Sequence, residues 1–352
     1  MAYTTIDDPA LYFNTVLYTG SGSAQDITTG HQPDMIWIKN RSYADHHQLV
    51  DRVRWVSTSN SAQLTPNATN QAGTKDVINS FSSTGYNLET GDRAYNSSDG
   101  DNFVSWSWKA NGAGSSNTDG TINSTKTSAN TTSGFSMVTY TGDDNSGATV
   151  GHGLGMAPSL IIVKALTKTD AWFVTGTPLG WNKYLLVDQG GAESGSSNNS
   201  FTGTAATSSV FSLGSDSGGN GSSYNYVAYL FSNVQGFSKV GTYTGNANVS
   251  GAFCFCGFSP AIIISKRTDA TSDWIIWDNK RDGYNETLKR NYPNDNAAEE
   301  NSTTQGVDFL SNGFKLRGTS SNAWNAAGAT YIFMAFAEAP FVNSNGIPCN
   351  AR

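Results

Sequence analysis

The sequence is poor in charged residues, which limits the kinds of protein it can encode. Asp, Glu, Lys and Arg make up 14% of its 352 residues, and the net charge is −7. Long amphipathic helices need a large supply of charged side chains, so this composition argues against a helical protein. Clustered cations are also missing. We therefore expect no nucleic-acid partner, because phosphate backbones are bound through such clusters.

Cysteines and long apolar runs are scarce as well. Three cysteines cannot form a disulfide framework, and we interpret Cys254 and Cys256 as buried free thiols. No run approaches the eighteen apolar residues of a membrane span, so we expect no membrane insertion. The first residues lack the basic and apolar regions of a secretory signal. We expect a protein that is made in a cytoplasm and either stays there or leaves by lysis.

The residues that are abundant favour β-structure. Glycine accounts for 37 residues and aromatics for 12% of the chain, with many Ser, Thr and Asn between them. Short strands joined by polar turns have this composition. We predict an all-β fold.

A pattern of residues occurs three times. Each copy has an F-x-x-V-(x)-x-Y-T-G element, then a proline, an apolar run, and a lysine six residues after the proline. The repeat positions are Tyr18, Tyr140 and Tyr243, Pro33, Pro158 and Pro260, and Lys39, Lys164 and Lys266. Each copy closes on an aromatic strand that begins at Phe103, Tyr226 or Tyr331. A period of about 100 residues suits autonomous sandwiches better than a solenoid.

We therefore predict three tandem, homologous β-sandwich (jelly-roll-like) domains. They are expected at residues 13–110, 134–233 and 236–341. Residues 1–12 are interpreted as an N-terminal arm, 111–133 as a Gly/Ser/Thr-rich linker or loosely held strand, and 342–352 as a C-terminal tail. The apolar runs, such as Met35–Ile38, predict strands that are covered on both faces or reach an interdomain contact. Gly241 is one residue more than the other copies have, which predicts a β-bulge.

The repeat positions are interpreted as structural. Each repeat lysine is expected to end an apolar strand with its stem over an aromatic ring. Trp172 and Trp274 lie eight residues after their lysines, and His47 takes this place in the first copy. We interpret His46 and His47 as part of a solvated loop and His152 as part of a glycine-rich turn. Adjacent strand residues point to opposite faces and cannot chelate one metal.

No constellation of catalytic, cofactor or metal-ligating residues stands out. The carboxylates are scattered, among them Asp269, Asp278, Glu299 and Asp308. None lies in a familiar glycosidase signature, although a sequence cannot show whether two acids face each other. We expect no enzyme, no cofactor and no metal.

Four tryptophans lie off the repeat pattern and are the candidate contacts to a ligand or receptor. They are Trp55, Trp181, Trp277 and Trp324. If exposed, their rings could stack on sugars, with Asn and Asp binding the hydroxyls.

Four features of the sequence carry a resemblance to a known family. They are the F-x-x-V-x-Y-T-G element, the Gly151-His152-Gly153-Leu154 loop with Pro158, the lysine-terminated strand and residues 308–316 (DFLSNGFKL). Over residues 10–341 the chain resembles a family of marine tailed-phage proteins described as virion structural or tail-fibre-related. The resemblance implies repeated jelly-roll or concanavalin-A-like β-sandwich modules and brings no catalytic residues. The first copy departs from it, with Thr28-Thr29-Gly30-His31-Gln32-Pro33 in place of the Gly-His-Gly-Leu loop.

From the resemblance and the composition we predict a non-enzymatic bacteriophage structural protein on the particle surface, associated with the tail or tail fibres. Its expected location is the virion and its expected partners are other virion proteins. A homo-oligomer is expected, with a trimer favoured because fibres are threefold. Two alternatives stay open: a capsid decoration protein, and a module that binds a host surface glycan or receptor. A glycan hydrolase ranks below them.

Overall fold

The fold is nearly all antiparallel strands, as predicted. A computed structural model describes residues 3–57, 60–195, 200–302, 304–318 and 323–349. Within these ranges the only helical segments are two short 3₁₀ turns, η1 (Pro9–Leu11) and η2 (Thr177–Leu179). No helix in the described part of the chain is long and apolar enough to cross a membrane.

Three sections of the chain form sheets with the same strand order. We call strands β1–β7 the first unit, β10–β17 the second and β18–β26 the third. The matching four-stranded orders are β1-β7-β3-β4, β10-β17-β12-β13 and β18-β26-β20-β21, all antiparallel. The repeat tyrosines occupy one register, because Tyr18 pairs with Phe103, Tyr140 with Tyr226 and Tyr243 with Tyr331. The threefold repetition seen in the sequence is thus present in the strand pairing, while the domain boundaries stay a prediction.

The bounds of the strands follow the chain order. The first unit contains β1 (Phe13–Thr19), β2 (Gln25–Thr28), β3 (Met35–Asn40), β4 (Gln48–Asp51), β5 (Ile78–Ser82), β6 (Gly85–Leu88) and β7 (Asn102–Trp108). Two strands come next, β8 (Ser115–Asn117) and β9 (Ser124–Asn130). The second unit contains β10 (Phe135–Thr141), β11 (Thr149–Gly151), β12 (Leu160–Ala165), β13 (Trp172–Gly176), β14 (Lys183–Leu186), β15 (Ser194–Gly195), β16 (Val210–Ser212) and β17 (Asn225–Phe231). The third contains β18 (Ser238–Thr244), β19 (Ser250–Phe255), β20 (Phe258–Arg267), β21 (Trp274–Asp278), β22 (Lys289–Arg290), β23 (Glu300–Asn301), β24 (Gly306–Leu310), β25 (Gly313–Arg317) and β26 (Thr330–Pro340).

Each main sheet is covered by a smaller sheet of its own unit. These small sheets are β2-β6-β5, β11-β16 and β19-β25-β24. Ile36 and Ile38 of β3 pack into the core between the two layers of the first unit, and Ile161 and Val163 of β12 do the same in the second. Each unit is therefore a two-layer sandwich.

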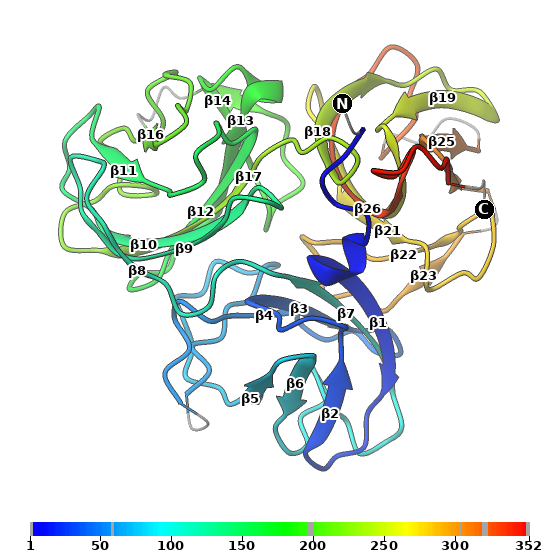
Figure 1. Cartoon of the computed structure of the whole chain (residues 1–352), viewed down its shortest axis with the longest axis horizontal. Coiled ribbons are helices and arrows are strands. Elements are labelled where there is room, and N and C mark those ends of the chain that lie inside the picture. The colour runs from blue at the N-terminus through cyan, green and yellow to red at the C-terminus, as the bar shows by residue number, and fades with distance from the viewer. Residues whose placement is uncertain (1–2, 58–59, 196–199, 303, 319–322, 350–352) are drawn as a thin grey trace.

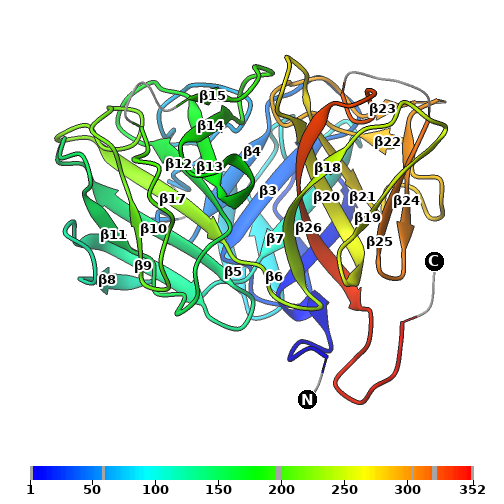
Figure 2. The ribbon, with the colours of Figure 1, turned by 90° about the horizontal axis from the view of Figure 1, so that it is seen from above.

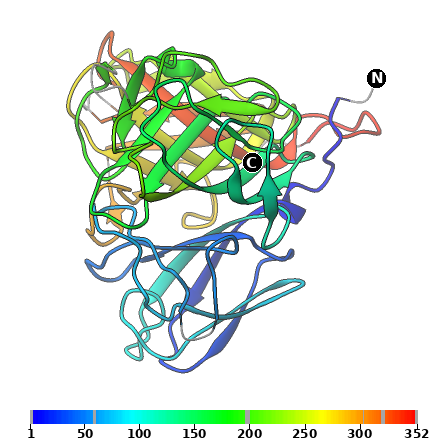
Figure 3. The ribbon, with the colours of Figure 1, turned by 90° about the vertical axis from the view of Figure 1, so that its left-hand side faces the viewer.

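The other face of each main sheet packs into a core that all three units share. Met35 and Trp37 of β3, Leu160 of β12, and Ile262 and Ile264 of β20 belong to this one cluster. The three units surround it as three lobes (Figure 1), and the view from the side shows the first unit below the other two (Figure 3). Both faces of the apolar strands are thus buried, which confirms the prediction made from their uninterrupted apolar runs.

Aromatic rings from the three units meet in the shared core. The Phe336 ring lies 5.2 Å from Phe13, 5.7 Å from Trp108 and 5.8 Å from Phe231, measured between ring centroids. The Phe237 ring lies 6.0 Å from it. Rings at these separations attract each other in addition to burying apolar area, so Phe336 couples all three units.

Hydrogen bonds join the units in a closed ring. The Nε1–H of Trp172, in the second unit, donates to the Ala68 carbonyl of the first at 3.1 Å. The Nε1–H of Trp274, in the third unit, donates to the Leu186 carbonyl of the second at 2.7 Å. His47 Nε2 lies 3.0 Å from the Tyr292 carbonyl, which closes the ring from first unit to third. The repeat position eight residues after the lysine therefore forms the contact between units.

A second set of contacts occupies two of the three junctions. The hydroxyl of Tyr229 donates to Asp51 at 2.6 Å, and Trp106 Nε1–H donates to Asp278 at 3.1 Å. At the third junction the equivalent positions hold Gly176 and Met334, so the acid and the donor are both replaced. Both carboxylates are fully buried and paired with arginine, at 2.6 Å for Asp51–Arg54 and 2.7 Å for Asp278–Arg281. A buried carboxylate is tolerated only because such partners compensate its charge.

The N-terminal arm and the C-terminal tail lie on the third unit and on each other. The Tyr3 hydroxyl donates to the Gly257 carbonyl at 2.8 Å, and the Thr4 hydroxyl to the Gln235 carbonyl at 2.9 Å. The Ser344 N–H donates to Asp7 at 2.7 Å near the ends of the chain (Figure 2).

Of the two interpretations of residues 111–133, a linker or a loosely held strand, the structure shows strands. β9 pairs with β10 and β8 with β9, which extends the second unit to an eight-stranded sheet. One expectation needs correction. Gly241 does not form a β-bulge, because β18 pairs with β26 in regular register from Ser238 to Thr244. Gly241 instead makes room for a ring: a Cβ atom there would lie 2.8 Å from Phe333. The irregular pairing occurs between β20 and β26, around Pro260.

Candidate functional site: the open edge of the third unit

Two of the four tryptophans predicted to contact a ligand are buried. Trp277 is 1% exposed and Trp324 0%, and their rings form an edge-to-face pair 6.1 Å apart in the core. The prediction is wrong for both: Trp277 lies in β21 (Trp274–Asp278), which is buried along its length, and Trp324 packs on the Trp277 ring.

The other two tryptophans are partly buried. Trp55 Nε1–H donates to the Ile78 carbonyl at 3.1 Å, and its ring packs edge-to-face on Phe81 at 5.6 Å. Trp181 packs against the core of the second unit. Trp55 and Trp181 belong to different units, and Trp277 and Trp324 are buried in the third, so the four side chains form no common surface.

The repeat lysines are buried to a degree that the sequence did not predict. Lys39, Lys164 and Lys266 are each 0% exposed, and their ammonium groups donate to main-chain carbonyls. Lys39 donates to Asn40 at 2.7 Å, Lys164 to Asp170 at 2.8 Å and Lys266 to Arg267 at 2.6 Å. Burial lowers the pKa of each ammonium to about 8. Each ammonium group is thus held by main-chain carbonyls inside the protein, while the packing of the stems over aromatic rings stays a prediction.

His47 does not belong to a solvated loop, because its side chain is fully buried. Trp37 Nε1–H donates to His47 Nδ1 at 2.8 Å, so the proton of the neutral ring is on Nε2 and points to the Tyr292 carbonyl. Burial, followed by the charge of Lys39, holds the pKa of His47 well below its ordinary value. This histidine links the first unit to the third.

Arginines hold the carboxylates that the sequence left unassigned. Glu299 pairs with Arg41 at 2.7 Å, Asp269 with Arg267 at 2.8 Å and Asp308 with Arg317 at 2.5 Å. Among the described residues no group of three or more His, Cys, Asp and Glu could hold a metal ion. Burial raises the pKa of the Cys254 thiol to about 12, so this thiol is inert at neutral pH.

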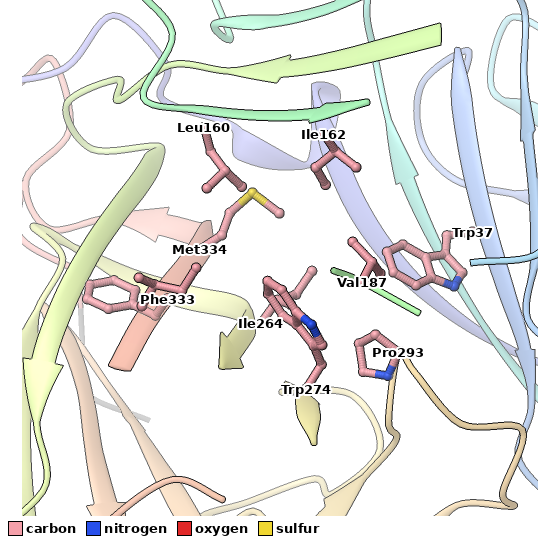
Figure 4. A pocket seen from close by; sticks show the side chains of 10 residues that line it. Trp37, Leu160, Ile162, Val187, Ile264, Trp274, Pro293, Phe333 and Met334 are labelled. Atoms are coloured by element: carbon pink, nitrogen blue, oxygen red, sulfur yellow. The ribbon is translucent and has the colours of Figure 1, made fainter. Parts of the chain in front are cut away.

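Two small apolar cavities lie in the shared core, where the three units meet. They measure about 30 Å³ and 20 Å³ and share Trp37, Ile162 and Ile264, which are the same repeat position in the three units. Figure 4 shows these side chains, together with Met334, pointing toward one another around the larger cavity. Ligand pockets are about ten times larger or more, and apolar cavities of this size stay dry. These cavities are packing gaps.

Larger grooves follow strand β18 at the edge of the third unit. A groove of about 510 Å³ lies between β18 and β19, and its walls include Lys239, Gly241 and Phe253. A second groove, of about 420 Å³, lies between β18 and the second unit, with Thr242 and Thr244 on one side and Pro178 on the other. The two grooves share the stretch Thr242–Thr244, so they flank one edge of one strand.

The two walls differ in chemistry. On the β19 side Phe253 and Phe255 are 47% and 58% exposed, which is unusual for rings of this size. On the side of the second unit the wall carries the Lys183–Glu193 ion pair at 2.5 Å. The edge of β18 therefore lies between an apolar and a polar wall.

Sequence reasoning missed this surface, although a signal was present. In the third copy Phe253, Cys254 and Phe255 occupy the strand positions of Thr149, Val150 and Gly151 in the second, because Cys254 pairs with Phe314 as Val150 pairs with Phe211. Cys254 and Cys256 are buried while both phenylalanines face outward. Because side chains alternate along a strand, burial of the two cysteines places both phenylalanines on the opposite, outer face, and this could have been predicted from the sequence.

Comparison with known families gives one match, which covers most of the chain. Residues 8–340 match the model of a domain of unknown function, DUF7483. The chain belongs to the DUF7483 family. No curated protein and no solved structure matches it. The family description assigns no activity, so the function is argued from the residues and their geometry.

Proposed function

We propose that this DUF7483 protein is a non-enzymatic structural protein on the surface of a bacteriophage particle, associated with the tail or its fibres. The observation that carries the proposal is the closed arrangement of three like units around one aromatic core, within a single chain. The ring of hydrogen bonds through Trp172, Trp274 and His47 fixes the units to one another. A particle component must keep its shape outside the cell, and a shared core serves this requirement.

The surface chemistry and the sequence resemblance support the same proposal. The chain is rich in Ser, Thr, Asn and Gly and carries a net charge of −7, which favours solubility over condensation with nucleic acid. The resemblance to marine tailed-phage virion proteins supplies the location. The proposal includes other virion proteins as partners and self-association, with the trimer as the first model.

Electron microscopy of a phage whose genome encodes the chain tests this proposal. In a whole-particle reconstruction, the three-lobed density should lie at the tail or its fibres. Density on the capsid surface would favour the decoration protein instead. Particles that lack the protein but keep their form and full infectivity would reject both.

A further inference from the structure

Strand β18 has one edge that no strand of the described chain pairs with, although the chain pairs the equivalent edge in the second unit. In the second unit the equivalent strand β10 pairs with β17 on one side and with β9 on the other. In the third unit β18 pairs with β26, and no strand of the described chain lies on its other side. Among the described residues, the same repeat position thus has a second partner strand in the second unit and none in the first or the third, where β1 and β18 are edge strands.

The pairing in the second unit shows which main-chain groups the added strand uses. The Gly142 N–H donates to the Tyr224 carbonyl, so Gly142, Tyr140 and every second residue before them face β17. The residues between them face the opposite way, toward β9. They pair as Phe135 with Asn130, Met137 with Ser128 and Thr139 with Lys126.

The same reasoning identifies the outward groups of β18. The Gly245 N–H donates to the Ala329 carbonyl at 2.9 Å, so Tyr243 and Gly241 face β26, while Thr242 and Thr244 face outward. Counted back from the repeat tyrosine, Thr242 corresponds to Thr139. Within the described residues, neither threonine has a partner for its outward N–H and C=O groups.

Along the first half of this edge, at Ser238 and Val240, the outward main-chain groups already have hydrogen-bond partners within the chain. The Ser238 N–H donates to the Val234 carbonyl at 2.9 Å. The Val240 N–H donates to the Asn233 side-chain oxygen at 2.6 Å, and the Asn233 amide donates back to the Val240 carbonyl at 3.4 Å. The open stretch therefore begins at Thr242, where the two grooves meet.

The wall that β19 forms beside the β18 edge differs in its side chains from the equivalent wall in the second unit, so it would suit a strand of different sequence. In the second unit Gly151 and Gly153 lie beside the added segment; a Cβ on Gly153 would lie 3.2 Å from Thr127. In the third unit Phe255 occupies the position of Gly151, because Phe255 pairs with Gly313 as Gly151 pairs with Val210. Phe255 and its neighbour Phe253 remain about half exposed. An aromatic ring at this position would cover a guest strand, whereas glycine in the second unit only leaves room for the added strand.

We propose that the Thr242–Thr244 edge of β18 is a docking site for an extended segment of a separate protein, which adds to the sheet as an antiparallel strand. Strand addition draws affinity from main-chain hydrogen bonds and specificity from alternate side chains. Unpaired edges otherwise attract unwanted association, and here the exposed rings increase that tendency. The inference depends on the geometry of the edge and not on where the protein sits on a particle.

The two walls define the sequence pattern of the guest. Guest residues opposite Gly241 and Tyr243 would face the groove of Phe253 and Phe255. The Phe333 ring, which lies over Gly241, also lines this groove, so small apolar side chains fit there. A guest residue opposite Thr242 would face the groove of the Lys183–Glu193 pair, where a hydroxyl or amide side chain fits. Alternation of small apolar and polar residues is therefore expected.

The test uses the full chain and a synthetic peptide of about eight residues that alternates valine and threonine, with capped ends and terminal lysines for solubility. Binding is followed by NMR through amide shifts and amide hydrogen exchange. The peptide should slow the exchange of the Thr242 and Thr244 amides by about tenfold or more at saturation. A version with N-methyl groups on alternate residues, which cannot donate, should bind about tenfold more weakly.

Variants of the protein give matched controls. Thr242→Pro removes an outward N–H that no strand uses, so it should leave the fold intact and weaken binding about tenfold or more. Thr242→Ala keeps the N–H and should bind within about threefold of wild type. Phe253→Ser removes part of the apolar wall and should weaken binding about tenfold without touching the edge.

Three results would overturn the proposal. They are no binding at millimolar peptide, equal binding of the N-methylated peptide, and shifts that lie away from β18 and persist in Thr242→Pro. A wild-type dimer in sedimentation that Thr242→Pro dissociates would mean that a second copy of this chain occupies the edge, and the assigned guest would be wrong.

Discussion

Three lysines at the same repeat position hold their ammonium groups inside the protein. Each is fully buried and has a pKa of about 8, against about 10.4 in an unfolded chain. Main-chain carbonyls satisfy the donors, but they do not replace all the water that a charge loses. The burial therefore costs free energy at neutral pH, and the cost should depend on pH.

Stability should rise with pH in mildly alkaline solution. Between about pH 8 and pH 10.4 the unfolded lysines bind more protons than the folded ones, so the free energy of unfolding increases with pH. We expect roughly 1–2 kcal/mol for each lysine between pH 8 and about pH 9.5. Urea denaturation across this range measures it. Burial raises the pKa of tyrosines such as Tyr140, which reverses the trend above about pH 10.

A pair of variants assigns this slope to the lysines. Lys266→Met should remove the contribution of one lysine, roughly 1–2 kcal/mol over this range, whereas Lys280→Met, at an exposed position, should remove much less. The buried thiols of Cys254 and Cys256 have raised pKa values and oppose the slope equally in both variants. Equal slopes in wild type and Lys266→Met would contradict the assignment.

Gly241 is predicted to be needed for the Phe333 ring. An alanine Cβ would lie 2.8 Å from two ring atoms, and the ring is buried against Phe314 and cannot move freely. Gly241→Ala should lower the free energy of unfolding by about 1–3 kcal/mol. Gly195→Ala is the control, since Gly195 is also in a strand and a Cβ there meets nothing within 4 Å. A Gly241→Ala protein as stable as the control would show that Phe333 adjusts.

At the scale of the element, the two edge strands should respond differently to proline. Lys126 of β9 pairs with Thr139, so Lys126→Pro removes a ladder hydrogen bond and should destabilise the protein by about 3 kcal/mol. Lys126→Ala should change stability little, and so should Thr242→Pro at the open edge. Chemical denaturation of the three variants measures the difference. A Thr242→Pro change as costly as Lys126→Pro would mean that the β18 edge is occupied within the chain.

The junction between the first and second units offers a conservative test. Tyr229→Phe removes the hydroxyl that donates to the buried Asp51 and keeps the ring, which stacks on Trp172 at 6.4 Å. We expect a loss of about 1–3 kcal/mol in thermal or chemical unfolding. Tyr184→Phe, at a partly buried tyrosine with no hydroxyl hydrogen bond in the described structure, should cost much less. Equal losses would mean that Arg54 alone satisfies Asp51.

At the scale of the whole molecule, the sequence predicted the positions of the strands better than the burial of individual side chains and the contacts between units. The repeat spacing located the Tyr-Thr-Gly strands, and the apolar run at Met35–Ile38 indicated a strand covered on both faces. The burial of Trp277 could not be predicted, because it depends on how the third unit folds over β21. His47 was misjudged for a related reason: its partner, Tyr292, belongs to another unit and lies 245 residues away.

The open edge of β18 escaped prediction because an edge is defined by what does not pair with it. Repeat matching aligned β10 with β18, but it carries no information about β9, which precedes the second copy and has no equivalent before the third. β18 begins at Ser238, seven residues after Phe231 at the end of β17, so the segment between them is too short to supply such a strand. Only the strand pairing distinguishes a filled edge from a vacant one.

Differential scanning calorimetry of the full chain tests the shared core most directly. Because Phe336 and its neighbours join all three units, we expect one transition whose calorimetric enthalpy equals its van't Hoff enthalpy. Two or three separate transitions, each with the enthalpy of one unit, would contradict the account. They would mean that the units fold independently and that the central contacts contribute little to their stability.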